Sequence, residues 1–245
     1  MSRARTFADL ATASEAGNLS KRNMLINSDM AVAQRGTSLS IVHDGTTDGY
    51  TCDRWLLQLS TSGNALDQLE GTLAQVAVTD LAGFNNALKW TTTEPESAIA
   101  SNEDFNICQK IEAQHCQRLG FGLSGAKRST ISFWVKSSVT GTYGINIFKA
   151  DSTARQLTST YTISSADTWE NKTITIPADT DSSGTIDDNN GEGLRLSFTL
   201  GVGSDYTSAN NALTWTNYAD AGWAYGHAQN GVLTTDNATW FLTGV

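Results

Sequence analysis

"TISFWVKSS", residues 130–138, alternates apolar and polar side chains along most of its length. Successive side chains of a β-strand point to opposite faces, so this stretch places Ile131, Phe133 and Val135 on one face. The opposite face carries Trp134 between smaller polar and charged neighbours. A two-residue period of this kind is typical of a half-buried strand, and the stretch therefore predicts a β-fold.

Nine further segments are strand candidates of the same kind, several with the same alternation. They are residues 53–60, 72–80, 87–93, 104–111, 142–148, 157–164, 171–177, 194–203 and 238–245. Turn residues such as Ser62-Gly63-Asn64 and Asp220-Ala221-Gly222 separate them. Many short strands with turns at this spacing predict an all-β, antiparallel β-sandwich or jelly roll. Residues 112–119 are the one modest helical candidate in the body of the chain.

The chain divides into two parts of different composition. Residues 1–22 are polar, Ala-rich and weakly amphipathic, and we interpret them as a docking or oligomerisation arm. Residues 23–245 are interpreted as one β-sandwich domain. The net charge of −9 opposes binding to nucleic acid and to anionic membranes. No apolar run is as long as a membrane span, so membrane insertion is not expected.

Catalytic motifs are absent from the sequence. The three histidines are far apart, and there is no G-x-S-x-G, H-E-x-x-H or P-loop pattern. We therefore expect a protein that is not an enzyme. The alternative is a polysaccharide-degrading enzyme, which requires two carboxylates facing each other in a cleft.

Acidic residues gather between residues 179 and 192, where no Lys or Arg occurs. Carboxylate oxygens are the ligands that calcium prefers, which makes this segment the best metal candidate. The candidate ligands are Asp179, Asp181, Asp187 and Asp188. The spacing departs from an EF-hand loop, because Ser183 and Asn190 replace expected ligands. The alternative is a solvated acidic loop without a cofactor.

Aromatic residues supply the candidates for a binding site. Trp134 lies on the polar face of its predicted strand, and a second cluster lies in the loop-like segment 215–230. Aromatic faces flanked by Asn, Gln and Asp suit sugar rings, which stack on the ring and hydrogen-bond through their hydroxyls. The candidate glycan ligands are Trp134, Trp215, Tyr218, Trp223 and Tyr225. The alternative is that these side chains pack in a satellite core or an oligomer interface.

Residues 23–55 resemble a passage of a known protein family. "NMLINSDMAVAQRGTS" (23–38) followed by "YTCDRW" (50–55) resembles the N-x-L-I-N-G-x-F-x-x-x-Q-R-G-T-S … Y-x-x-D-R-W passage of bacteriophage tail-fibre and related virion proteins, especially those of marine and cyanobacterial phages. Ser28 stands where Gly is usual, and Met30 where Phe is usual. Later passages resemble the same family in the same order, so the resemblance covers most of residues 23–245.

The resemblance implies a jelly-roll sandwich similar to carbohydrate-binding modules, displayed on a virion and commonly trimeric. The expected role is adsorption of the phage to host-surface glycans, with residues 1–22 docking to other virion proteins. Virions assemble in the host cytoplasm and act outside it. The alternative is a structural virion component, such as a head decoration, collar or fibre connector. From its residues, the 23–38 stretch itself is expected to form two short strands around Asn27-Ser28-Asp29.

Overall fold

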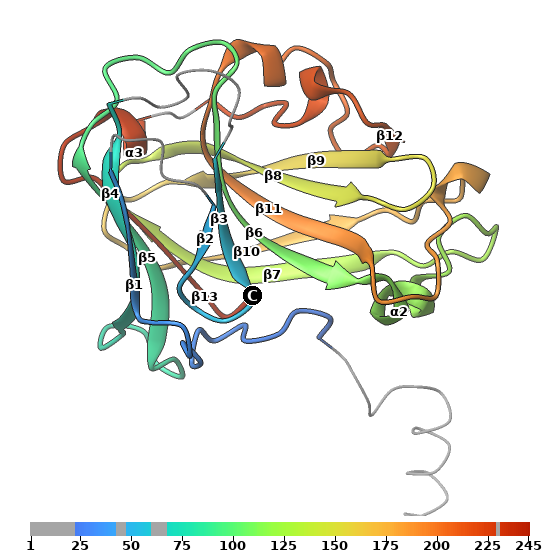
Figure 1. Cartoon of the computed structure of the whole chain (residues 1–245), viewed down its shortest axis with the longest axis horizontal. Helices are drawn as coiled ribbons and strands as arrows, with labels where there is room; N and C mark the ends of the chain where they lie inside the picture. The colour runs from blue at the N-terminus through green and yellow to red at the C-terminus, as the bar shows by residue number, and fades with distance from the viewer. Residues whose placement is uncertain (1–22, 43–47, 60–67, 229–230) are drawn as a thin grey trace, which may run out of the picture.

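A computed structural model describes residues 23–42, 48–59, 68–228 and 231–245. The predicted arm, residues 1–22, lies outside the described residues. Two antiparallel sheets form the body of the molecule (Figure 1). This arrangement confirms the all-β, antiparallel sandwich predicted from the sequence.

The six-stranded sheet and the seven-stranded sheet each combine strands from distant parts of the chain. The order in the six-stranded sheet is β1 (Ser38–Ile41), β4 (Glu70–Ala77), β5 (Asn86–Glu94), β13 (Thr239–Thr243), β7 (Ser129–Ser137) and β10 (Glu170–Ile176). The order in the seven-stranded sheet is β12 (Thr216–Asn217), β9 (Arg155–Ile163), β8 (Gly141–Lys149), β11 (Glu192–Val202), β6 (Asp104–Glu112), β3 (Trp55–Leu59) and β2 (Gly49–Tyr50).

In the described part of the chain, helical structure is limited to short turns in the connections. There are two α-helical turns, α2 (Ala113–Cys116) and α3 (Gly231–Thr234). There are also four 3-10 turns: η1 (Gln117–Leu119), η2 (Ser182–Gly184), η3 (Ser204–Tyr206) and η4 (Asp220–Gly222). The first α-helical turn and η1 occupy the helical candidate at residues 112–119. In the described residues, no helix is long and apolar enough to cross a membrane.

The core between the sheets consists largely of the apolar residues that alternate along the predicted strands. Phe133 and Val135 of β7 are fully buried, whereas Trp134 on the other side of the strand is half-buried. Phe133 packs edge-to-face on Phe198 of the opposite sheet, with ring centroids 5.0 Å apart. Phe198 in turn lies 5.9 Å from Trp240 of β13. Aromatic pairs at such distances add favourable packing to the area they bury.

The 23–38 stretch does not contain the two strands expected around Asn27-Ser28-Asp29. Residues 24–26 and 30–32 instead form an irregular loop, because their backbone groups bond to side chains. The side chain of Gln109 in β6 accepts from the Ile26 amide at 2.7 Å and donates to the Ile26 carbonyl at 2.9 Å. The Val245 amide donates to the Ser28 carbonyl, and Asn23 donates to the Val245 carbonyl at 2.8 Å. The stretch therefore ties the chain end to the seven-stranded sheet.

Asn27 is the residue that fixes this loop, and its replacement gives a first prediction. Its amide donates to the carbonyls of Val32 and Asp53 and accepts from the Val32 amide at 2.9 Å, while its φ is 56°. Asn27→Ala removes these three bonds, so we expect the free energy of unfolding to fall by about 2 kcal/mol. Urea denaturation measures the change.

Asn237 offers a matched control, since its φ is 57° but its amide bonds only to the exposed neighbour Asp236. Asn237→Ala carries the same backbone strain without the loss of the loop bonds, and a small effect is expected. Equal destabilisation by both variants would show that backbone strain, rather than the Asn27 bonds, holds the loop.

Candidate functional site

A pocket of about 280 Å³ opens on the outer face of the seven-stranded sheet. Strands of the sheet line one part of the pocket, and the connection between β11 and α3 lines the rest. The lining residues are Gln58, Leu59, Asp104, Phe148, Arg195, Tyr206, Tyr218, Asp220 and Trp223. We refer to these nine residues as the aromatic pocket.

Three aromatic rings meet in the aromatic pocket. The ring centroid of Phe148 lies 5.4 Å from that of Tyr218 and 6.0 Å from that of Trp223. Tyr218 and Trp223 lie 6.2 Å apart and nearly perpendicular, at an interplanar angle of 81°. Trp223 is 7 % exposed and Tyr218 is 42 % exposed, so Tyr218 offers the ring surface that a ligand can reach.

Phe148 owes its position to the strand period. Its neighbours Ile147 and Lys149 are buried on the other side of β8, so the Phe148 ring projects from the outer face. Arg195 of β11 pairs with Phe148 across the sheet, and its guanidinium lies 5.3 Å from the Phe148 ring centroid. This separation is within the range of a cation–π contact.

Arg195 is held in one orientation by its hydrogen bonds. Its guanidinium donates to both carboxylate oxygens of Glu192, at 2.8 and 3.1 Å, and to the side-chain oxygen of Gln58 at 3.1 Å. A bidentate pair of this kind fixes the plane of the guanidinium. The Arg195 guanidinium, paired with Glu192, therefore forms an edge of the pocket with a fixed orientation.

Carboxylates frame the opposite side of the pocket. The Tyr218 hydroxyl donates to Asp220, and Asp104 accepts from the amide of Asn106. Burial, the bond to Asp220 and the nearby carboxylates raise the pKa of Tyr218 well above its usual range. Tyr218 therefore stays a neutral hydroxyl that can take part in hydrogen bonding at any physiological pH. Fixed acceptors beside an exposed ring are the groups that suit a ligand rich in hydroxyls.

The structure brings together only two of the five predicted glycan ligands. Tyr218 and Trp223 line the aromatic pocket, whereas Tyr225 is half-buried in the following turn and is not among the lining residues. Trp134 lies on the outer face of the six-stranded sheet. Trp215 packs edge-to-face on Phe121, with ring centroids 5.3 Å apart, and donates to the Pro177 carbonyl, away from the aromatic pocket.

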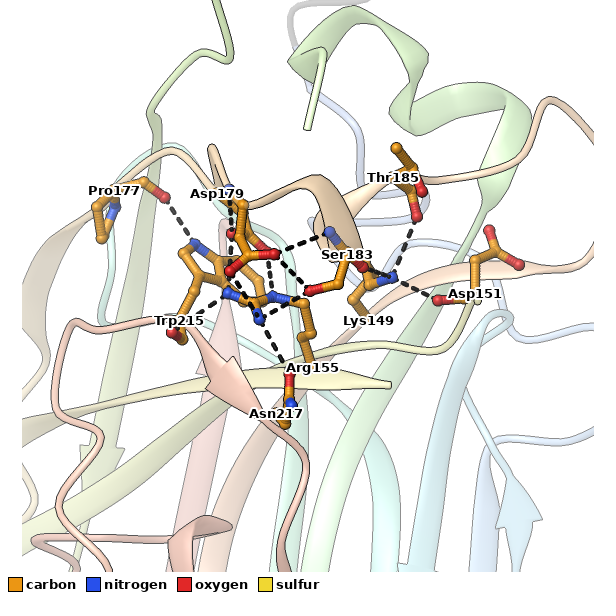
Figure 2. Close-up of polar contacts among 10 residues, drawn as sticks. Lys149, Asp151, Arg155, Pro177, Asp179, Ser183, Thr185, Trp215 and Asn217 are labelled. Carbon is orange, nitrogen blue, oxygen red and sulfur yellow. Dashed lines mark hydrogen bonds and ion pairs between the residues drawn. The ribbon is translucent and has the colours of Figure 1, made fainter. Parts of the chain in front are cut away.

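The four predicted calcium ligands do not converge on one point in the structure. Asp179 is 2 % exposed, and both of its oxygens accept from the Arg155 guanidinium, at 2.6 and 3.0 Å (Figure 2). Asp181 caps η2 through Ser183, while Asp187 and Asp188 are exposed. Among the described residues, no group of three or more acidic, His or Cys side chains converges on one point. Asp179, one of the four candidate ligands, is instead paired with Arg155.

A buried lysine ammonium group lies among the backbone carbonyls of this loop. Lys149 is fully buried, and its ammonium group donates to the carbonyls of Ser183, at 2.9 Å, Thr185, at 3.1 Å, and Asp151 (Figure 2). Backbone carbonyl oxygens are common calcium ligands, and here three of them accept hydrogen bonds from the Lys149 ammonium group. The positive side chains of Lys149 and Arg155 therefore bond to oxygens of this loop.

Calcium should leave the stability of the protein unchanged. A ligand that binds the folded state raises Tm, and this loop already satisfies its oxygens with Lys149 and Arg155. Melting curves in EDTA and in excess calcium should therefore coincide. A calcium-dependent rise in Tm that disappears in Asp179→Asn would show that this loop binds calcium.

A larger hollow of about 1030 Å³ lies at one end of the sandwich. Its walls include Met24, Leu25 and Val245 together with apolar residues of both sheets, and neither Trp nor Tyr lines it. Phe84 and Phe121 give it two aromatic rings, but it lacks an exposed tyrosine ring hydrogen-bonded to a carboxylate, which the aromatic pocket provides. Polar and charged side chains line both hollows, and the smaller one is the candidate site because it adds an exposed tyrosine ring beside Asp220.

Fold and pocket together define an all-β sandwich protein with an aromatic, carboxylate-framed pocket on the outer face of one sheet. No protein-family model matches the chain, and a search of curated proteins gave no match. Among solved structures, it is similar to a "putative sugar binding protein" from Bacteroides thetaiotaomicron, with 11 % identity, a TM-score of 0.43 and coverage of 91 % of this chain and 97 % of the other. A structure described as "CBM4" is similar at 14 % identity, a TM-score of 0.37 and coverage of 89 % and 97 %. Similarity at this level assigns no residue a role.

Proposed function

We propose that the chain is a phage virion protein of the tail-fibre or appendage type whose β-sandwich binds host-surface glycans. The observation that carries the binding function is the aromatic pocket, in which the exposed ring of Tyr218 lies beside Asp220 and the guanidinium of Arg195. A sugar ring stacks on the aromatic face, and its hydroxyls bond to the carboxylates and to Gln58. Host glycan is therefore the proposed ligand class.

The virion assignment is supported by the sequence resemblance of residues 23–55 to tail-fibre and related proteins. On this proposal, the protein assembles with other virion proteins in the host cytoplasm, as a homo-oligomer that we propose to be a trimer, through residues 1–22. It then acts outside the cell at the host surface. Several weak sites on one particle bind a surface far more tightly than one site alone, because linked sites have a high effective concentration.

The proposed function is tested by binding of the purified full-length oligomer to a glycan array and to whole host cells. We expect retention on a restricted set of glycans and competition by the free sugars. The absence of binding to every glycan and every cell type would overturn the proposal.

A structural virion component is the second candidate, and the outer face of the six-stranded sheet favours it. There the Lys136 ammonium lies 4.8 Å from the Trp169 ring and 4.5 Å from the Phe241 ring, and Lys89 lies 5.3 Å from Phe241. Half-buried aromatics of this kind suit a subunit interface. A protein that binds no glycan, and whose assembly fails in Phe241→Ala, would be structural.

We propose that the protein acts without catalysis. Asp104 and Asp220 both line the aromatic pocket, and two carboxylates in one cleft are a feature that a glycosidase would share. Each instead accepts a hydrogen bond from a neighbour and serves as a fixed acceptor. Bound glycan should be recovered uncleaved. Release of reducing ends that stops in Asp220→Asn would establish the enzyme.

A further inference from the structure

The outer face of the seven-stranded sheet is polar where the chain covers it. Asn106, Asn146, Ser197 and Thr199 are all fully buried. They share one face, because Asn106 pairs with Thr199 and Ser197 pairs with Asn146 in the sheet register, while their neighbours in sequence enter the core. We refer to these four residues as the polar floor.

Segment 203–228, which we call the cover, lies over the polar floor. It contains β12, which pairs with β9 at the edge of the sheet (Figure 1). The Trp223 carbonyl accepts from the Asn146 amide at 2.8 Å, and the Trp223 indole lies 3.5 Å from the side-chain oxygen of Asn106. Only Val202, Trp223 and Ala224 are buried in the small apolar cluster on this face, with Phe148 and Tyr206 against them. Most of the apolar packing in the described residues lies instead between the sheets.

Some atoms beneath the cover have no hydrogen-bond partner. Among the described residues, these include the side-chain oxygens of Asn146 and Ser197 on the floor. Gln156 and Asn211 each leave one more buried polar atom without a partner near the same cover. A buried polar atom without a partner costs free energy, and apolar side chains at these positions would avoid that cost. The floor is therefore better suited to contact with a polar ligand than to contact with the cover.

Trp223 connects the floor to the aromatic pocket. Its ring lines the pocket beside Phe148, while its carbonyl and indole nitrogen contact Asn146 and Asn106. Displacement of Trp223 would join the pocket and the floor in one continuous groove across β6, β11 and β8. The Ser197 hydroxyl and the Asn146 oxygen would then face that groove.

We propose that the polar floor is a second sugar subsite, which a glycan longer than one residue opens by displacing Trp223. This inference rests on the proposed function and adds to it the class of ligand: a chain of at least two sugars. The first sugar occupies the aromatic pocket, and hydroxyls of the next bond to Ser197 and Asn146.

Ser197→Ala is the test, because it removes one hydroxyl that has no partner and changes nothing else on the floor. Binding of an oligosaccharide selected on the array should weaken by about fivefold, as expected for one lost hydrogen bond. The Tm should stay equal or rise. Thr162→Val is the matched control, since Thr162 is an exposed hydroxyl on β9 of the same sheet, and it should change neither quantity.

Two results would overturn the second subsite while the proposed function stands. One is oligosaccharide binding by Ser197→Ala that equals that of the parent. The other is a Tm that falls together with binding, since the hydroxyl would then be structural. Failure of the parent protein to bind any glycan would overturn the proposed function and this inference with it.

Discussion

Asp179→Ala should lower the free energy of unfolding by about 3–5 kcal/mol, as is typical when one partner of a buried ion pair is removed. Asp179 and Arg155 are 2 % and 5 % exposed, and the substitution leaves the guanidinium in the interior without its carboxylate. The same guanidinium also donates to Ser183, Asn217 and the Trp215 carbonyl. We therefore expect the 179–187 loop and β12 to loosen together, which hydrogen exchange would show.

Asp188→Ala is the control for that change, because Asp188 belongs to the same acidic segment but is exposed. Its effect on the unfolding free energy should stay within about 0.5 kcal/mol. Denaturant unfolding of both variants measures the difference. Two similar values would mean that the buried pair contributes no more than a surface carboxylate.

Tyr218→Ala should weaken glycan binding at least about tenfold, which corresponds to ~1.4 kcal/mol. The substitution removes the most exposed ring of the aromatic pocket together with the hydroxyl that bonds to Asp220. Exposed Tyr and Trp side chains commonly dominate the free energy of binding sites. Titration calorimetry of the full-length oligomer with a selected glycan measures the loss.

Trp134→Ala and Tyr218→Phe separate the possible reasons for such a loss. Trp134 lies on the outer face of the other sheet, so its replacement should leave glycan affinity unchanged. Tyr218→Phe keeps the ring and removes the bond to Asp220, and it should lose less affinity than Tyr218→Ala. Loss of binding in Trp134→Ala with retention in Tyr218→Ala would move the site to the six-stranded sheet.

The longer strands were predictable because each of them leaves a local signal in the sequence. All ten candidate segments overlap a strand, since Ile131, Phe133 and their counterparts repeat at the period of the pleat. The strands that were missed, β1, β2 and β12, are two to four residues long, which is too short for a period to show. The 23–38 loop was mistaken for strands because its apolar residues alternate, while the hydrogen bonds that shape it join it to distant residues, Asp53 and Gln109.

The pocket was only partly predictable, since it depends on register between strands. Tyr218 and Trp223 stood out as a local aromatic cluster. Phe148 and Arg195 carry the signal of an outward position, but they are 47 residues apart and meet only through the pairing of β8 with β11. The ion pair of Asp179 with Arg155 likewise spans 24 residues, so a carboxylate that looked available for calcium is already bound.

Photo-crosslinking with a diazirine-bearing glycan from the array locates the binding site on the full-length oligomer. Mass spectrometry of the labelled peptides should place the label on segments that line the aromatic pocket, around Phe148, Tyr206 and residues 218–223. Excess free glycan should abolish the labelling. Competable labelling confined to the face that carries Trp134, or to the large hollow around Met24 and Val245, would contradict glycan binding in the aromatic pocket.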